Sequence, residues 1–146
     1  MKIVRTDLEF VREPLMSPFG FKGAYVSELW QTVVGVKNSD GIRATGLGVQ
    51  SVLWSDASVF KNSTVVGGNL QMLSITEYAL KLLENTDFVT PIEALEEIKP
   101  KVYEYAKQVT NNSKLRPTFA LNALVSVDNA LWQLYAKEKN TQIRRA

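Results

Sequence analysis

The segment that says most about the fold of this chain is Val127-Asp128-Asn129-Ala130-Leu131-Trp132-Gln133-Leu134-Tyr135-Ala136-Lys137. It lies within residues 118–139, where large apolar residues recur at alternating spacings of four and three. That spacing predicts one long amphipathic helix. The apolar stripe consists of Ala120, Leu124, Val127, Leu131 and Leu134. Ala123 and Ala130 add small residues beside the stripe, as expected of a buried helix that its neighbours approach closely.

Two more helices are expected upstream. The first begins at Asn69 as N-cap, runs to about Asn85, and has an apolar stripe of Leu70, Leu73, Leu80 and Leu83. The second begins at Thr90-Pro91-Ile92-Glu93, a capping box with proline at the first helical position. Its stripe consists of Leu95, Ile98, Val102, Ala106 and Val109. Pro100 lies within this helix and is expected to kink or break it.

Residues 1 to about 60 are rich in Val, Phe, Trp, Thr and Gly, a composition that predicts strands. We expect strands over residues 1–11, 25–37 and 42–49, with a loop over residues 14–23. Asp40-Gly41 supplies the positive φ of a tight hairpin turn. The expected fold class is therefore α+β: a three-stranded antiparallel meander followed by a bundle of about three helices.

Gly46 and Gly48 lie on one face of the third expected strand. Their missing side chains would let a helix or another backbone approach closely. The same Gly-x-Gly pattern invites a nucleotide-binding interpretation. We reject that interpretation because the third glycine is missing and no helix opens directly after a first strand.

Composition excludes several classes of function. The formal net charge of +2 is too small to indicate nucleic acid or an anionic membrane as partner, and we interpret the one basic cluster, Arg144-Arg145, as a solvated tail. The chain has no cysteine and no histidine, so it lacks disulfides, thiolate metal sites and the commonest general base. No signal peptide or membrane-spanning run is recognisable, and we expect a cytoplasmic protein.

Two aromatic segments are the candidates for ligand recognition, because loops on a rigid scaffold often carry it. The first contributes Phe19, Phe21, Lys22 and Tyr25, and the second contributes Gln50, Ser51 and Trp54. The residues alone leave an alternative open, in which Phe19, Phe21 and Trp54 simply cover the end of the sheet.

The chain resembles one known domain in the order and spacing of its features. These features are the meander, the Asp-Gly hairpin, the Gly-x-Gly, the Thr90–Glu93 helix start and the C-terminal helix. It is the N-terminal capping domain of enolase-superfamily enzymes, in the mandelate racemase and muconate lactonising enzyme branch. There a helix of the form AxDxALWDLxxK closes the domain. This chain has Gln133 where the second Asp is usual, and Val49 where Glu commonly follows the Gly-x-Gly.

The resemblance implies that residues 1–140 form a substrate-capping, specificity-determining domain and residues 141–146 a tail. The catalytic (β/α)₈ barrel, which takes about 250 residues, would be missing from this chain by natural truncation, frameshift or excision. In relatives the barrel binds Mg²⁺, and a barrel base removes the proton α to a carboxylate. Such racemases, epimerases, dehydratases and cycloisomerases are isomerases or lyases. The seven loop residues would contact the distal part of a small carboxylate substrate.

We expect no catalytic residue, metal site or cofactor in this chain, and therefore no activity from it alone. Lys99-Pro100-Lys101 has the spacing of a catalytic lysine pair, but we reject it because it lies on a helix. Glu96-Glu97 is interpreted as a solvated helix face. Asp128 is interpreted as a residue that hydrogen-bonds a neighbouring loop or the barrel, and Trp132 as an anchor in the core or against the barrel.

Two other functions stay open. The chain could be a non-catalytic interaction module from a truncated gene, which self-associates into a homo-oligomer through apolar surface that the barrel would otherwise cover. It could also be a free-standing binder of small molecules.

Overall fold

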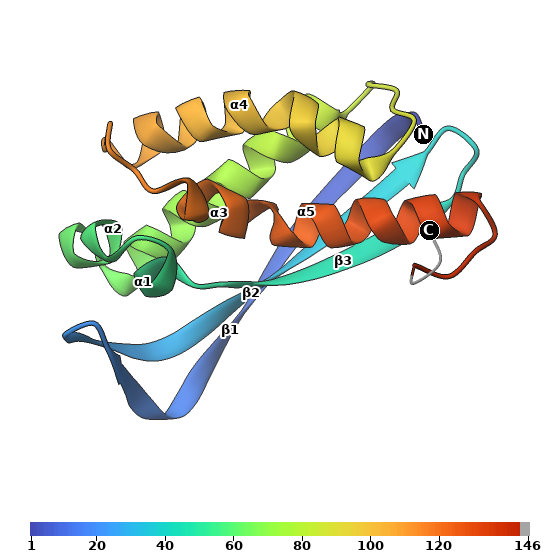
Figure 1. Ribbon diagram of the computed structural model, residues 1–146. Coiled ribbons are helices and arrows are strands. Elements are labelled where there is room, and N and C mark those ends of the chain that lie inside the picture. Colours follow the sequence, from blue (N-terminus) through green and yellow to red (C-terminus); the bar gives the residue numbers. More distant parts are fainter. Residues whose placement is uncertain (144–146) are drawn as a thin grey trace.

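A three-stranded antiparallel sheet carries the helices on one of its faces (Figure 1). The computed structural model describes residues 1–143; the Arg144-Arg145 part of the expected tail lies outside these described residues. The strands are β1 (Ile3–Phe21), β2 (Ala24–Asn38) and β3 (Arg43–Gln50), in the order β1-β2-β3. Gly41 adopts the expected positive φ, at +83°. The predicted α+β class and the meander are confirmed, and the described residues contain no barrel.

The β1–β2 hairpin is longer than the sequence indicated. Residues 14–23, expected to be a loop, belong mostly to β1, and pairing continues to Phe21 opposite Ala24. Lys22 and Gly23 form the tight turn with φ of +53° and +73°. Between the pairs Pro14–Glu28 and Phe19–Val26 the register shifts, so that β1 bulges outward. The two prolines and two glycines mark this bulge and the turn, not one long loop.

Five helices follow the sheet: α1 (Val52–Ser55), α2 (Ala57–Asn62), α3 (Val65–Leu83), α4 (Pro91–Val109) and α5 (Pro117–Glu138). The short helices α1 and α2 were not predicted, because a helix of one or two turns shows no apolar period. The N-cap of α3 is Thr64, whose Oγ1 accepts from Gly67 N, so the prediction of Asn69 was wrong. Leu70, assigned to the apolar stripe, is 47% exposed.

Pro100 does not break α4, although a kink or a break was predicted there; the helix runs from Pro91 to Val109 without interruption. Pro100 lies on the exposed side, where water can hydrate the carbonyl that loses its partner. The predicted helix start at Thr90 is present: Glu93 N donates to Thr90 Oγ1 over 3.2 Å, while Glu93 Oε2 accepts from the N–H of Val89, one residue before the position that a capping box uses, over 2.8 Å. No helix within residues 1–143 is both long and apolar enough to cross a membrane.

Helix α5 runs along β3, as Figure 1 shows, and also packs against β2, α3 and α4. All five residues of its predicted stripe are buried. Buried hydroxyl groups fasten it on both sides. Thr32 Oγ1 donates to Ser126 Oγ over 3.0 Å from β2, and Thr76 Oγ1 donates to the carbonyl of Ala123 over 2.8 Å from α3. This helix is therefore the centre of the core.

The two glycines of β3 let α5 approach the sheet closely, as predicted. A Cβ on Gly46 would lie 2.0 Å from the carbonyl oxygen of Ser126 and 2.3 Å from Ala130 N. A Cβ on Gly48 would lie 2.9 Å from Ser126 N. Backbone atoms cannot yield as a flexible side chain can, so only glycine fits at Gly46.

Close approach also lets α5 cover the free edge of β3. Along the helix, Asn122 Nδ2, Asn129 Nδ2 and Lys137 Nζ donate to three β3 carbonyls, at 3.1, 2.7 and 2.7 Å. Those carbonyls belong to Val49, Leu47 and Arg43. Edge carbonyls are otherwise available to pair with another chain. Helix α5 thus closes this edge of the sheet and sets its own register on β3.

Substituting Gly46→Ala should lower the free energy of unfolding by about 3 kcal/mol or more, because α5 must move away from β3. Gly35→Ala is the matched control: its Cβ would meet only the Asp7 side chain at 3.4 Å, and we expect a change within about 0.5 kcal/mol. Urea unfolding of both variants measures the difference. Equal stability of the two variants would contradict the packing described for α5.

Candidate functional site

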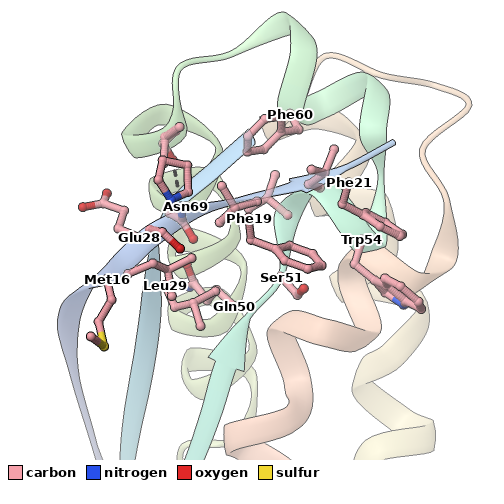
Figure 2. A pocket seen from close by; sticks show the side chains of 17 residues that line it. Met16, Phe19, Phe21, Glu28, Leu29, Gln50, Ser51, Trp54, Phe60 and Asn69 are labelled. Atoms are coloured by element: carbon pink, nitrogen blue, oxygen red, sulfur yellow. Dashed lines mark hydrogen bonds between the residues drawn. The ribbon is translucent and has the colours of Figure 1, made fainter. Parts of the chain in front are cut away.

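A cavity of about 470 Å³ opens where the β1–β2 hairpin faces the segment that follows β3 (Figure 2). Its wall combines four parts of the chain: the bulge and second half of β1, the start of β2, residues 50–54, and the beginning of α3 with Phe60 of α2. These parts are distant in sequence and meet because β3 brings residue 50 beside Trp30 of β2.

Five of the seven candidate residues line this cavity: Phe19, Phe21, Gln50, Ser51 and Trp54. Phe19 and Phe21 alternate along β1 and point to the same face. The ring of Phe21 stacks on that of Trp54, with centroids 4.8 Å apart and planes 19° apart, and on that of Phe19 at 6.3 Å. Figure 2 shows the three rings together on one side of the cavity. The two predicted segments therefore come together through aromatic stacking.

Lys22 and Tyr25 do not line the cavity. Lys22 Nζ lies over the rings of Phe21 and Trp54, at 5.2 and 5.6 Å from their centroids, and donates to the carbonyl of Trp54 over 3.4 Å. It links the hairpin tip to α1. Tyr25 pairs with Gly20, so it lies on the opposite face of the hairpin, where it is 72% exposed.

Gln50 is buried, and its side-chain amide forms hydrogen bonds to α3. In the orientation that satisfies both ends of the amide, its nitrogen donates to the carbonyl and Oδ1 of Asn69, at 2.9 and 3.0 Å. Its oxygen accepts from Leu73 N at 3.1 Å. Asn69 Nδ2 in turn donates to the carbonyl of Val65 over 2.8 Å. This amide network holds the end of β3 against α3 and forms the polar part of the wall.

Glu28 is the one charged group that residues 1–143 contribute to the lining, and two neighbours bind its carboxylate. Trp30 Nε1 donates to it over 2.9 Å, and the Arg12 guanidinium forms a salt bridge with it at 2.9 Å. The hydrogen bond from Trp30, followed by those from Arg12, holds the pKa of the Glu28 carboxyl below its usual value. Arg12 also lies over the Trp30 ring. Glu28 is therefore an occupied ion-pair partner and not a free base.

Helix α5 positions the segment that carries Gln50, Ser51 and Trp54. Asn122 Oδ1 accepts from Ser51 N over 2.7 Å and from Ser55 Oγ over 3.2 Å, while its Nδ2 donates to the carbonyl of Val49. One side chain thus fixes both the end of β3 and the start of α1. Sequence reasoning missed Asn122, since an asparagine inside a helix gives no signal of what it contacts.

Asp56 anchors the far end of the same segment. Its buried carboxylate accepts from Ser58 Oγ, from Ser58 N at 2.9 Å and from Arg116 N at 3.0 Å. Burial raises the pKa of the Asp56 carboxyl, but the hydrogen bonds from Ser58, Arg116 and Val59 outweigh it and the pKa is lowered. Asp56 therefore stays ionised, caps α2 and joins it to the loop before α5.

Twelve further lining residues were not predicted, among them Met16, Leu29, Phe60 and Asn69. Met16 is fully exposed on the β1 bulge, and Phe60 reaches the cavity from α2. Neither the bulge nor α2 was expected from the sequence. Aromatic clustering was the only available signal, and it identified Phe19, Phe21 and Trp54.

Asp128 and Trp132 lie elsewhere, on α5. Asp128 lines a shallow groove between α4 and α5, where burial raises the pKa of its carboxyl against the opposing effect of a hydrogen bond with Trp132. Its partner is thus on its own helix, not on a neighbouring loop. Trp132 is half-buried, so it does not anchor the core. Among residues 1–143, no three Asp or Glu side chains gather as Mg²⁺ ligands would, so these residues do not fit that ion.

The fold matches solved structures of enolase-superfamily enzymes. L-talarate/galactarate dehydratase from Salmonella typhimurium LT2, liganded with Mg and L-lyxarohydroxamate, matches 99% of this chain with a TM-score of 0.63 and 17% identity. An enolase from alpha proteobacterium bal199 with bound Mg matches 95% with a TM-score of 0.63 and 12% identity. Dipeptide epimerase from Enterococcus faecalis V583, with Mg and L-Leu-L-Tyr, matches 95% with a TM-score of 0.56 and 14% identity.

In each case the match covers 32% of the solved chain, so this chain spans about a third of the length of those enzymes. The sequence matches no protein-family model, and no curated protein is detectably similar to it. At these identities the likeness concerns the fold. The chain has the fold that enolase-superfamily enzymes contain over that third of their length, which confirms the resemblance inferred from its motifs.

Substituting Asn122→Ala should loosen residues 49–56, because Ser51 N loses its acceptor and the carbonyl of Val49 its donor. We expect a loss of about 1–3 kcal/mol in the free energy of unfolding and faster amide hydrogen exchange at Ser51. Asn129→Ala is the matched control on the same helix, since it removes only the bond to the carbonyl of Leu47. If both variants leave exchange at Ser51 unchanged, α5 does not hold this segment.

Stability in acid should depend on Asp56. Because its pKa is lowered on folding, its hydrogen bonds stabilise the fold above the unfolded pKa of about 3.9, and this contribution is lost as pH falls through the folded-state pKa. Asp56→Asn should therefore lower the free energy of unfolding by about 2 kcal/mol at pH 7. The difference in unfolding free energy between the variant and the wild type should become smaller below about pH 4. Denaturant unfolding across pH measures this difference. The exposed Asp40, changed to Asn, should show no such difference at any pH.

Proposed function

We propose that residues 1–140 are the N-terminal capping domain of an enolase-superfamily enzyme of the mandelate racemase and muconate lactonising enzyme branch. The cavity between the hairpin and residues 50–54 would cover the distal part of the substrate. The observation that carries the proposal is the cavity itself. Two segments picked out as substrate loops build one concave aromatic wall, within a fold that matches these enzymes across 95% of the chain.

The reaction of the whole enzyme would be removal of the proton α to a carboxylate, followed by racemisation, epimerisation, elimination or cycloisomerisation. When bound in the barrel, Mg²⁺ would stabilise the negative charge that develops on the substrate. The residues of this chain would do other work. Phe19, Phe21 and Trp54 would exclude water from the substrate, and the Lys22 contact with Trp54 would keep the hairpin tip closed.

The chain by itself is not catalytically complete in this proposal. It has no histidine. Lys99 and Lys101 flank Pro100 on α4, away from the cavity, and Lys99 forms an ion pair with Glu96. Glu28, the carboxylate in the cavity, is held by Arg12 and Trp30. The carboxylate that the described residues bring to the cavity is therefore already paired and not free to accept a substrate proton.

The matching enzymes do not identify the substrate. One was crystallised with the dipeptide L-Leu-L-Tyr and another with L-glucarate, so the same fold serves an apolar dipeptide and a polyhydroxylated acid. What these ligands share is a carboxylate. A small carboxylate substrate, together with Mg²⁺ and a barrel supplied by further chain, is the partner set that we propose.

A second candidate function is self-association without catalysis. The sheet face opposite the helices exposes apolar side chains: Val11 is 51% exposed, Leu47 57% and Val49 45%. These residues share one face, because Val11 and Val49 both pair with Gln31, and Leu47 pairs with Val33. A second copy of the chain could cover this surface and give a homo-oligomer.

Two measurements on this 146-residue chain separate the candidates. We expect no Mg²⁺-dependent exchange of α-protons into D₂O across a panel of carboxylates, followed by NMR. The protein that the native host makes should be larger by a barrel-sized domain and should catalyse that exchange. Exchange by the short chain would contradict the proposal. A native protein near 16.4 kDa that sediments as a dimer or larger would favour the self-associating module.

A further inference from the structure

We infer that the cavity accepts an uncharged, apolar group, branched aliphatic or aromatic, at the distal end of a small carboxylate substrate, and that it excludes polyhydroxylated acids. This inference rests on the proposed function, which leaves the class of substrate open. It follows from what the cavity wall offers to a ligand and from what the wall has already committed to other parts of the chain.

The wall is mostly hydrocarbon. Leu29 and Met16 lie on one side, and Phe19, Phe21 and Trp54 lie on the other, as Figure 2 shows. Phe60 lies above them. Trp54 is 64% exposed and Phe19 60%, so a ligand between these two sides would cover apolar surface that water now contacts. Removing apolar surface from water is the main source of affinity in such a cavity.

The amide side chains of the wall already have partners, whereas the hydroxyls of Ser17 and Ser51 have none among the described residues. The Gln50 amide is bonded at both ends to α3, and Asn69 bonds to Gln50 and to the carbonyl of Val65. The main-chain N–H of Ser51 donates to Asn122. A ligand with several hydroxyl groups would lose its water here and find few free donors or acceptors. Burying a hydroxyl without a hydrogen bond is unfavourable, so a sugar-like acid is a poor occupant.

The charges also argue for an uncharged distal group. A second carboxylate on the ligand would enter beside Glu28, which lowers its affinity. A cationic group would have to compete with Arg12 for Glu28, where the Arg12 side chain forms three hydrogen bonds to the carboxylate, at 2.9, 3.0 and 3.2 Å. The Lys22 ammonium lies outside the cavity, over the rings of Phe21 and Trp54. The cavity therefore offers neither sign of charge to a ligand.

The size of the cavity fits one side chain of a small molecule. Its volume of about 470 Å³ lies within the range of ligand pockets, roughly 300–1,000 Å³. It is bounded by the hairpin on one side and α1 on the other, so the group must enter from the open rim.

The test is a titration of the 146-residue chain with two kinds of probe. The first is a series of N-acyl-L-alanines from acetyl to octanoyl, and the second is D-glucarate. Calorimetry gives affinity and heat-capacity change, and amide NMR shifts give the place of binding. We expect affinity to rise about fourfold for each methylene buried, with a negative heat-capacity change. Shifts should be confined to residues 15–29, 50–54 and 60–69, and glucarate should cause none there.

Two valines of β2 provide the matched variants. Both are half-buried, but Val26 lines the cavity and Val33 lies on the outer sheet face. Val26→Thr should weaken binding of the longest acyl probe by about fourfold or more, since a hydroxyl replaces a methyl group in the wall. Val33→Thr should leave it unchanged. Equal effects of the two substitutions would contradict the inference.

Failure of this inference and failure of the proposed function give different results. If glucarate binds at the cavity residues and the affinity of the N-acyl-alanines does not change with chain length, the inference of an apolar ligand is wrong. The proposed capping function would remain. Shifts from the acyl probes only at Leu47 and Val49 would move binding to the outer face and overturn the inference. If neither probe shifts the cavity residues, the cavity is not a ligand site, and both the inference and the proposed role of the cavity fall.

Discussion

The structure depends on how closely α5 lies against β3. Gly46 brings the two backbones together at a distance that no side chain permits. Only at that distance can Asn122, Asn129 and Lys137 reach the carbonyls along the free edge of β3. A contact normally treated as apolar packing therefore also satisfies an edge of the sheet. The contact also fixes the position of α5 along the length of β3, since the three donors must each meet a particular carbonyl.

This contact reaches the candidate site through Asn122. The same side chain that completes the β3 edge also accepts from Ser51 N, at the first residue after the strand. The position of residues 50–54 is therefore set by their hydrogen bonds to α5, the central helix of the core. Asp56 adds a second attachment at the loop before α5. The hairpin tip, by contrast, meets these residues through ring stacking and the Lys22 contacts.

A strand-favouring composition and turn residues predicted the three strands and their meander, because strand pairing across a tight turn is local. The stripe of α5 and the helix start at Thr90 were also right, since each depends on residues within a few turns of one another. The errors came where distant packing overrides local preference. Pro100 is tolerated on the exposed side of α4, residues 14–21 extend a hairpin despite two prolines, and α1 and α2 are stabilised by contacts rather than by a period.

By itself, the sequence determined the α+β class, the order of the elements, the close approach at Gly46 and Gly48, and the aromatic segments that meet at the site. These follow from the spacing of apolar residues, from the residues that favour turns, and from the lack of a side chain at the two glycines of β3. Only the tertiary structure decided which of those aromatic and polar residues share a cavity. Tyr25 is directed away because it pairs with Gly20, and Phe60 and Asn69 join from helices whose starts the sequence concealed. Which side chains converge depends on strand register and helix placement, and these are settled by packing across the whole domain.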